Sequence, residues 1–114
     1  INDDFNAADF EKAKMKEIGL IDEIYPRYRS TYYSHIFSGG YSAGYYVYYW
    51  AAVLDSDAFN YFKESGDLFN PELAAKFRQH CLQECGNDEG MVQYKKFRGQ
   101  EPSNEPFLKK HGLN

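Results

Sequence analysis

The sequence predicts an all-α fold, a small helical body of four to five helices. Three observations favour this class. Apolar residues recur at helical spacing over residues 43–58, several segments carry helix start and stop signals, and no segment alternates regularly enough to indicate a strand. A chain of 114 residues can bury one hydrophobic core, so we expect residues 1–114 to form one domain at most.

The longest predicted helix covers residues 42–65 and ends at Gly66. One of its sides forms an ordinary core seam, made of Ala43, Val47, Trp50, Leu54 and Ala58. The opposite side carries three phenols, Tyr41, Tyr45 and Tyr48, together with Ala52. Because neither side is polar, the phenols are expected to face a second wall of protein, a cleft or a partner.

The other elements are shorter. A helix over residues 2–16 ends at Gly19, and a connector over residues 20–28 contains the helix-breaking Pro26. Residues 30–37 fit either an extended segment or a short helix. The last three helices are expected over residues 71–85, 88–98 and 106–110. Asn70-Pro71-Glu72 is the start signal of the first of these. The second is capped by Asp88 and has an apolar stripe made of Met91, Val92, Tyr94 and Phe97.

Composition excludes several classes of protein. A net charge of −4 disfavours a nucleic-acid surface, which needs a basic groove for phosphates. The longest apolar run, residues 44–54, is shorter than the roughly 20 residues needed to cross a bilayer, and no signal peptide is visible. We therefore expect neither nucleic acid nor membrane as partner. The chain begins at Ile1 without an initiator methionine, so we expect it to be cut from a longer polypeptide.

No metal site is expected in this chain. Cys81 and Cys85 lie four apart on a predicted helix and are interpreted as small buried hydrophobic residues, with the adjacent His80 facing away from them. The other histidines, His35 and His111, are far apart, and none begins a His-Glu-x-x-His motif.

The candidate functional residues lie between His35 and Tyr48, with Gly39 and Gly40 between them. A lone histidine is more often structural than functional, and tyrosines at helical spacing are more often packing than chemistry. A histidine, a glycine loop and several phenols in one short stretch nevertheless provide neutral donors suited to a peptide backbone or a developing oxyanion.

Residues 27–59 and 96–114 resemble the C-terminal segment of the peptidyl-dipeptidases, a branch of the thimet oligopeptidase family of zinc metallopeptidases. The resemblance extends over essentially the whole chain. Its most specific part is the set His35, Tyr41, Tyr45 and Tyr48 around the double glycine. The six-residue step from His35 to Tyr41 is similar to the peptidyl-dipeptidase branch rather than to the related endopeptidases.

The resemblance implies a zinc-dependent hydrolase that removes dipeptides from the free C-termini of oligopeptides. The family fold is a mostly helical clamshell around a deep channel, with zinc held by a His-Glu-x-x-His motif that this sequence lacks. The chain is then the C-terminal portion of the catalytic domain, its partner is the upstream part of the same enzyme, and the isolated segment is inactive. A cytoplasmic location is expected, with export left open.

The resemblance also implies residue roles. His35 and Tyr48 are catalytic residues that bind the substrate backbone and stabilise the oxyanion, while Tyr41 and Tyr45 position the peptide. Gly39 and Gly40 form a mobile channel wall. Arg27 or Arg29 could bind the substrate carboxylate, although either could instead pair with a surface acid.

Two alternatives remain open at this point. The chain could be a free-standing helical module that binds a peptide or a sugar on its tyrosine face. The isolated fragment could also associate with itself through exposed apolar surface.

Overall fold

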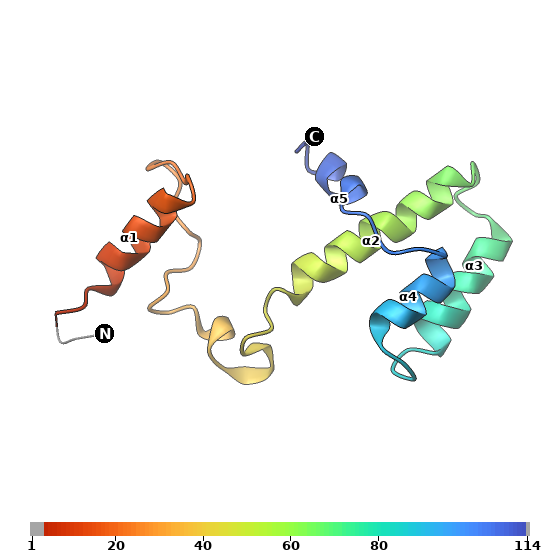
Figure 1. Ribbon diagram of the computed structural model, residues 1–114, viewed down its shortest axis with the longest axis horizontal. Coiled ribbons are helices and arrows are strands. Elements are labelled where there is room, and N and C mark those ends of the chain that lie inside the picture. Colours follow the sequence, from red (N-terminus) through yellow and green to blue (C-terminus); the bar gives the residue numbers. More distant parts are fainter. Residues whose placement is uncertain (1–3, 114) are drawn as a thin grey trace. The chain divides into compact units, whose positions relative to one another are not determined.

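The computed structural model describes residues 4–113 and contains five α-helices in that range, with no strand (Figure 1). The all-α prediction and the predicted number of helices are therefore confirmed. The chain forms two compact units, one covering the described residues up to Tyr45 and the other the described residues from Tyr46. Each unit is described by itself.

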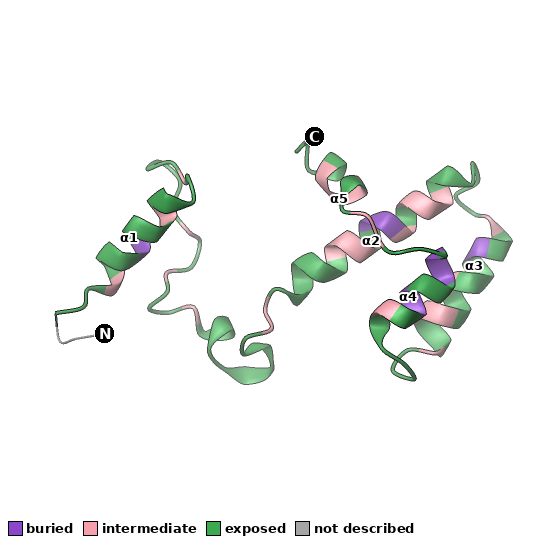
Figure 2. Ribbon diagram, viewed as in Figure 1, coloured by how far each residue is buried: buried purple, intermediate pink, exposed green. Residues whose placement is uncertain are grey.

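The first unit begins with helix α1, Ala7–Glu17. The side chain of Asn6 caps it, accepting hydrogen bonds from the amides of Ala8 and Asp9 at 2.9 and 3.2 Å. The predicted start at Asn2 lies outside the described residues. The predicted stop is confirmed, because Gly19 takes the left-handed conformation, φ 84°, just after the helix. Almost all of α1 is exposed, and its one buried side chain is Glu11 (Figure 2).

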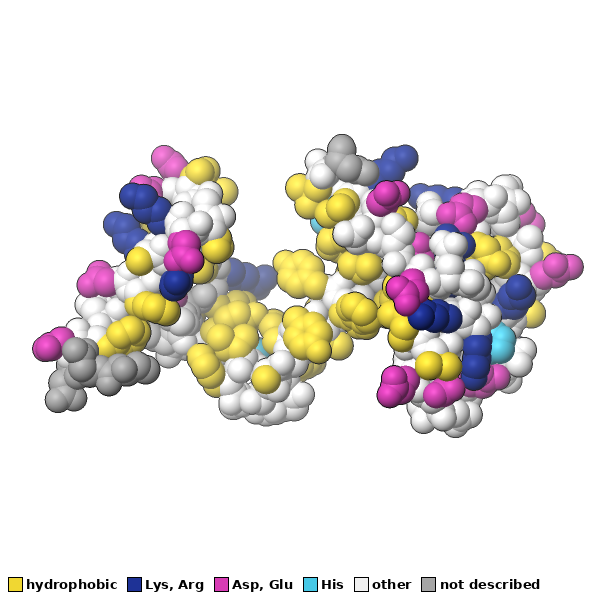
Figure 3. All heavy atoms as spheres, viewed as in Figure 1, with side chains coloured by type: hydrophobic (Ala, Val, Ile, Leu, Met, Phe, Trp, Pro, Cys, Tyr) yellow, Lys and Arg dark blue, Asp and Glu magenta, His cyan; other side chains and the backbone are white. Residues whose placement is uncertain are grey.

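Two short 3₁₀-helices follow, η1 at Ser34–Ile36 and η2 at Gly39–Tyr41. Of the two structures left open for residues 30–37, the short helix is thus the one present. Hydrophobic side chains, a class that here includes tyrosine, gather over the segment that carries η1 and η2 (Figure 3). This segment contains most of the candidate site.

The second unit is built on helix α2, Val47–Glu64. The predicted start at Ser42 is wrong. Ser42, with φ −51° and ψ 122°, is not helical, and Ala43 has φ 55°, a left-handed conformation that cannot continue a right-handed helix. The 18 helical residues span about 27 Å at the α-helical rise.

The predicted core seam of this helix is only partly correct. Its first part is exposed, by 44% at Val47 and 50% at Trp50. Leu54 and Ala58, one and two turns further on, are half-buried. The buried side of α2 within the described chain therefore lies in its second half.

Helix α3, Pro71–Phe77, begins as predicted, with the Asn70 side chain accepting from the amides of Glu72 and Leu73. It continues as a π-helix, η3, over Arg78–Gln83, so the predicted regular helix to Cys85 is wrong. Cys81 is half-buried, but Cys85 lies beyond the helix and is exposed, which corrects its interpretation as a buried hydrophobic residue.

Helix α4, Gly90–Arg98, follows, and α5, Glu105–Lys110, ends the described helices. The N-cap of α4 is Glu89 instead of the predicted Asp88, whose carboxylate accepts from the Glu89 amide at 2.9 Å. Gly99, with φ 83°, ends α4 as predicted. In the second unit α5 packs along α2, and α3 and α4 lie side by side (Figure 1).

The core of the second unit centres on Phe97, which is 1% exposed. Its ring contacts four other aromatic rings at centroid distances of 5.3 to 6.4 Å, those of Tyr61, Phe62, Phe77 and Tyr94. The predicted stripe on α4 is confirmed at Tyr94 and Phe97 but not at Val92, which is exposed. Edge-to-face and tilted ring contacts of this kind stabilise the core in addition to the burial of apolar area.

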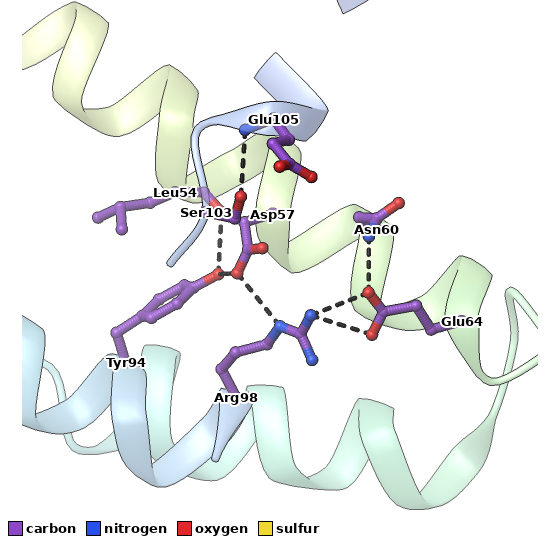
Figure 4. Close-up of polar contacts among 8 residues, drawn as sticks. All are labelled: Leu54, Asp57, Asn60, Glu64, Tyr94, Arg98, Ser103 and Glu105. Atoms are coloured by element: carbon purple, nitrogen blue, oxygen red, sulfur yellow. Dashed lines mark hydrogen bonds and ion pairs between the residues drawn. The ribbon is translucent and has the colours of Figure 1, made fainter. Parts of the chain in front are cut away.

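A buried polar network joins α2 to α4 beside this core (Figure 4). Asp57, only 1% exposed, accepts from the Tyr94 hydroxyl at 2.6 Å and from Arg98 Nε at 3.2 Å. Arg98 also pairs with Glu64 at 2.9 Å. Burial, and next the hydrogen bond to Asp57, raise the pKa of Tyr94. The Oδ2 atom of Asp57 is thus paired with a cation and a phenol, while its buried Oδ1 has no hydrogen-bond partner among the described residues.

Candidate functional site

The candidate site of the first unit is a cluster of four rings, the His35 imidazole and three tyrosine rings that contact it. The imidazole lies 4.9 Å from the Tyr45 ring, 5.7 Å from Tyr41 and 6.2 Å from Tyr33, between ring centroids. Tyr45 meets Tyr41 and Tyr33 edge to face at 5.2 and 5.5 Å. We call the rings of Tyr33, His35, Tyr41 and Tyr45 the His35 cluster.

Backbone contacts close the loop that carries these rings. The Ser38 amide donates to the Ser34 carbonyl at 2.8 Å, and the Ala43 amide donates to the Ile36 carbonyl at 3.4 Å. Gly39 takes φ 69°, a conformation that residues with a Cβ disfavour. Apart from the adjacent residues, no described residue has an atom within 4 Å of where a Cβ would stand on Gly39 or Gly40. The roles of Gly39 and Gly40 as a channel wall stay a prediction.

The three phenols do not share one helix face, and that prediction is wrong. Tyr41 ends η2, Tyr45 lies in the turn that follows, and only Tyr48 belongs to α2. The left-handed Ala43 lies between Tyr41 and Tyr45, and Tyr45 still precedes the start of α2 at Val47. Ring contacts with His35 bring Tyr41 and Tyr45 together instead. Tyr48 lies in the first turn of α2, in the second unit, where it is 56% exposed.

The two candidate arginines have different surroundings. Arg29 donates from Nε to the carboxylate of Glu11, which also accepts from the Ser30 amide at 2.7 Å. That amide, the largest cause, and the arginine hold the pKa of Glu11 below its ordinary value. The Arg27 guanidinium lies over the Tyr28 ring, 5.4 Å from its centroid. Arg29 therefore already binds a carboxylate of its own chain.

Sequence reasoning missed Glu11. A signal was available, because Glu11 lies one helical turn from both Ala7 and Met15, which are the half-buried residues of α1. This face is the one side of α1 that is partly buried. An acidic side chain in the middle of it needs a hydrogen-bond donor or a cation as partner.

The described residues do not fit a zinc ion. Over residues 4–113, no three His, Cys, Asp or Glu side chains form a group that could hold a metal. His80 Nδ1 lies 3.2 Å from Glu84, and His111 Nδ1 lies 2.8 Å from the Phe107 carbonyl oxygen.

Among the described helices, none combines the length and the apolar character required to cross a bilayer.

Comparison with known proteins defines the class of the chain as a segment of a peptidase. The sequence model of Peptidase family M3 matches residues 2–113, and the chain belongs to this family. The family consists of zinc metallopeptidases, in agreement with the resemblance found in the sequence.

Similar proteins include two enzymes of Escherichia coli K12. The chain is 43% identical to its dipeptidyl carboxypeptidase over 108 residues and 47% identical to its oligopeptidase A over 81 residues. Saccharolysin of Saccharomyces cerevisiae is 38% identical over 81 residues. These alignments cover 93%, 71% and 71% of this chain, but only 16%, 12% and 11% of the respective relatives. The chain is thus a partial segment relative to these enzymes.

Proposed function

We propose that the chain supplies the substrate-binding and oxyanion-stabilising part of a zinc peptidase that releases dipeptides from the C-termini of oligopeptides. The observation that supports this proposal is the His35 cluster, an imidazole surrounded by phenol-bearing rings in a chain of Peptidase family M3. Neutral N–H and O–H donors in such an arrangement suit a peptide carbonyl.

Each donor has a proposed role. The His35 imidazole and the Tyr48 hydroxyl donate hydrogen bonds to the scissile carbonyl oxygen, where negative charge develops in the transition state. Tyr41 and Tyr45 bind the peptide beside His35, which their ring contacts already hold in place. The zinc supplies an activated water when bound, and its ligands are proposed to lie in the upstream part of the same enzyme.

Release of dipeptides, rather than internal cleavage, is proposed from two observations. Alignments with dipeptidyl carboxypeptidases cover 93% and 96% of the chain, whereas those with bacterial oligopeptidases A cover 71%. The spacing from His35 to Tyr41 is also similar to that of the peptidyl-dipeptidases. Arg27 is the favoured receptor for the substrate carboxylate, with Arg29 second because it pairs with Glu11.

A pair of peptides tests this proposal in the complete enzyme. One peptide has a free C-terminal carboxylate and the other a C-terminal amide. We expect a dipeptide to be released from the acid, and at most a small fraction of that rate from the amide, because the arginine then has no charged partner. The measurement is product formation followed by chromatography.

N-terminal acetylation of the same peptide is the control, and it is expected to leave the rate unchanged. Equal rates for acid and amide, or cleavage within the peptide, would contradict dipeptide release. Arg27→Gln is expected to raise KM for the acid alone. If Arg27→Gln leaves KM for the acid unchanged, Arg27 does not bind the substrate carboxylate.

The isolated chain is proposed to be inactive, because its described residues, 4–113, do not fit a metal. Exposed aromatic side chains, among them Tyr46, Tyr49 and Trp50, support the expectation that the isolated chain associates with itself. A cytoplasmic location of the complete enzyme is proposed by analogy with the probable cytosolic oligopeptidase A of Arabidopsis thaliana. No specific observation favours a free-standing peptide- or sugar-binding module.

A further inference from the structure

Glu11 is an unusual residue to find buried. Helix α1 is otherwise mostly exposed, yet this one carboxylate is only 8% exposed. A buried charge is costly unless it is paired and hydrogen-bonded. Glu11 satisfies this condition with two donors that are adjacent in sequence, the Arg29 side chain and the Ser30 amide. The carboxylate therefore fixes one point of the backbone far along the chain from α1.

That point is the start of the turn that leads to His35. The Arg29 carbonyl accepts from the amides of both Tyr32 and Tyr33 at 3.0 Å, and the Ser34 amide donates to the Tyr32 carbonyl at 2.9 Å. Helix η1, which contains His35, begins at Ser34. A displacement of Arg29 and Ser30 would thus be passed on directly through the backbone to η1.

A second path runs through the rings. Tyr28, just before Arg29, stacks on Tyr33 at 4.8 Å between centroids with the planes 29° apart. Tyr33 in turn contacts His35 and Tyr45. Stacked and edge-to-face pairs of this kind prefer defined geometries, so the position of Tyr28 constrains Tyr33. The first path begins at Arg29, which Glu11 holds, and the second begins at Tyr28, the residue directly before it.

We propose that Glu11 is a positioning residue for the His35 cluster. Its carboxylate holds Arg29 and the Ser30 amide, and this contact sets the turn that presents Tyr33 and His35 to the substrate. Arg29 is then the partner of Glu11 instead of a receptor for the substrate carboxylate. The inference rests on the proposed function of His35 and assigns a role to α1, a helix with no residue in the site itself.

The structural part is tested in the 114-residue chain by NMR, without reference to activity. Glu11→Gln keeps the size of the side chain but removes its charge. We expect it to shift the Ser30 amide and the ring signals of His35 and Tyr45. Glu17→Gln is the matched control on the same helix, since Glu17 is exposed and pairs only with Lys14 in the described contacts. It is expected to leave the ring signals unchanged.

If Glu11→Gln abolishes the helical signal of α1, Arg29→Lys takes its place, because it keeps the positive charge while removing the Nε donor. A folded variant of either kind with wild-type ring signals for His35 and Tyr45 would overturn the proposal. Glu11→Asp retains the charge and is expected to restore the ring signals in part.

The complete enzyme provides the functional readout. Glu11→Gln is expected to lower kcat by roughly ten- to a hundredfold with little change in KM, the loss typical of a misplaced catalytic group. Glu11→Asp should recover part of that loss. A wild-type kcat for Glu11→Gln would overturn the positioning role. A wild-type kcat for His35→Ala would instead contradict the proposed function, while the NMR result on Glu11 would remain valid.

Discussion

Tyr48→Phe is expected to lower kcat of the complete enzyme by a factor of roughly a hundred to a thousand, the usual cost of removing one oxyanion donor. The substitution deletes only the phenolic O–H and keeps the ring. KM should change little, because the lost hydrogen bond is proposed to strengthen as charge develops on the carbonyl oxygen. The measurement is steady-state peptide hydrolysis, with the zinc content determined in parallel and expected to be unchanged.

Tyr49→Phe is the matched control for this substitution. Tyr49 is the next residue of α2 and is more exposed than Tyr48, and its ring meets Phe107 edge to face at 6.4 Å. That contact needs the ring but not the hydroxyl, so Tyr49→Phe is expected to keep the wild-type kcat. A wild-type rate for Tyr48→Phe, or equal losses for both variants, would remove Tyr48 from the proposed mechanism.

Asp57→Ala is expected to destabilise the second unit by about 3–5 kcal/mol, the range measured when one partner of a buried ion pair is removed. The substitution leaves the Arg98 guanidinium and the Tyr94 hydroxyl buried without the acceptor they share. Since small domains have a free energy of unfolding of about 5–15 kcal/mol, this loss is a large fraction of the total. Urea denaturation of the chain measures it as a lower midpoint.

Asp55→Ala is the control, two residues earlier on the same helix. Asp55 is exposed and lies 3.7 Å from the exposed Lys110, so its removal is expected to cost no more than about 1 kcal/mol. Equal midpoints for Asp55→Ala and Asp57→Ala would show that the buried network contributes little. Asp57→Asn, which keeps an acceptor but loses the charge, should fall between the two.

Local signals correctly predicted several of the helix ends. Asn70 with Pro71, Gly19 and Gly99 each act within a few residues of the chain, and the structure confirms all three. Such signals depend on backbone geometry that is nearly independent of the rest of the fold. The same applies to Pro106, which lies in the first turn of α5.

The start of α2 could not be predicted in the same way. Alanine is the best helix former, and nothing local to Ala43 indicates φ 55°. The turn there is held by contacts with Phe37 and Ile36, to which the Ser42 hydroxyl and the Ala43 amide donate. Periodicity cannot reveal such contacts, and for this reason the helical pattern wrongly predicts the three phenols on one helix face.

Residue type and spacing in the sequence point to the residues of the candidate site, whereas their geometry depends on contacts across the loop. His35, Tyr41 and Tyr45 do lie together, through ring contacts across a loop. Glu11 and Asp57 were missed for a common reason. Each is a buried acid whose donors come from a distant part of the chain, and a single sequence does not show that pairing.

The central claim is that His35 and Tyr48 act on the same carbonyl oxygen of the substrate. A double-mutant cycle in the complete enzyme, with His35→Ala, Tyr48→Phe and the double variant, tests it most directly. Groups that act as a unit show strongly non-additive losses, so kcat of the double variant should fall far less than the product of the two single losses. Losses that multiply would show that the two side chains act independently and would contradict the account.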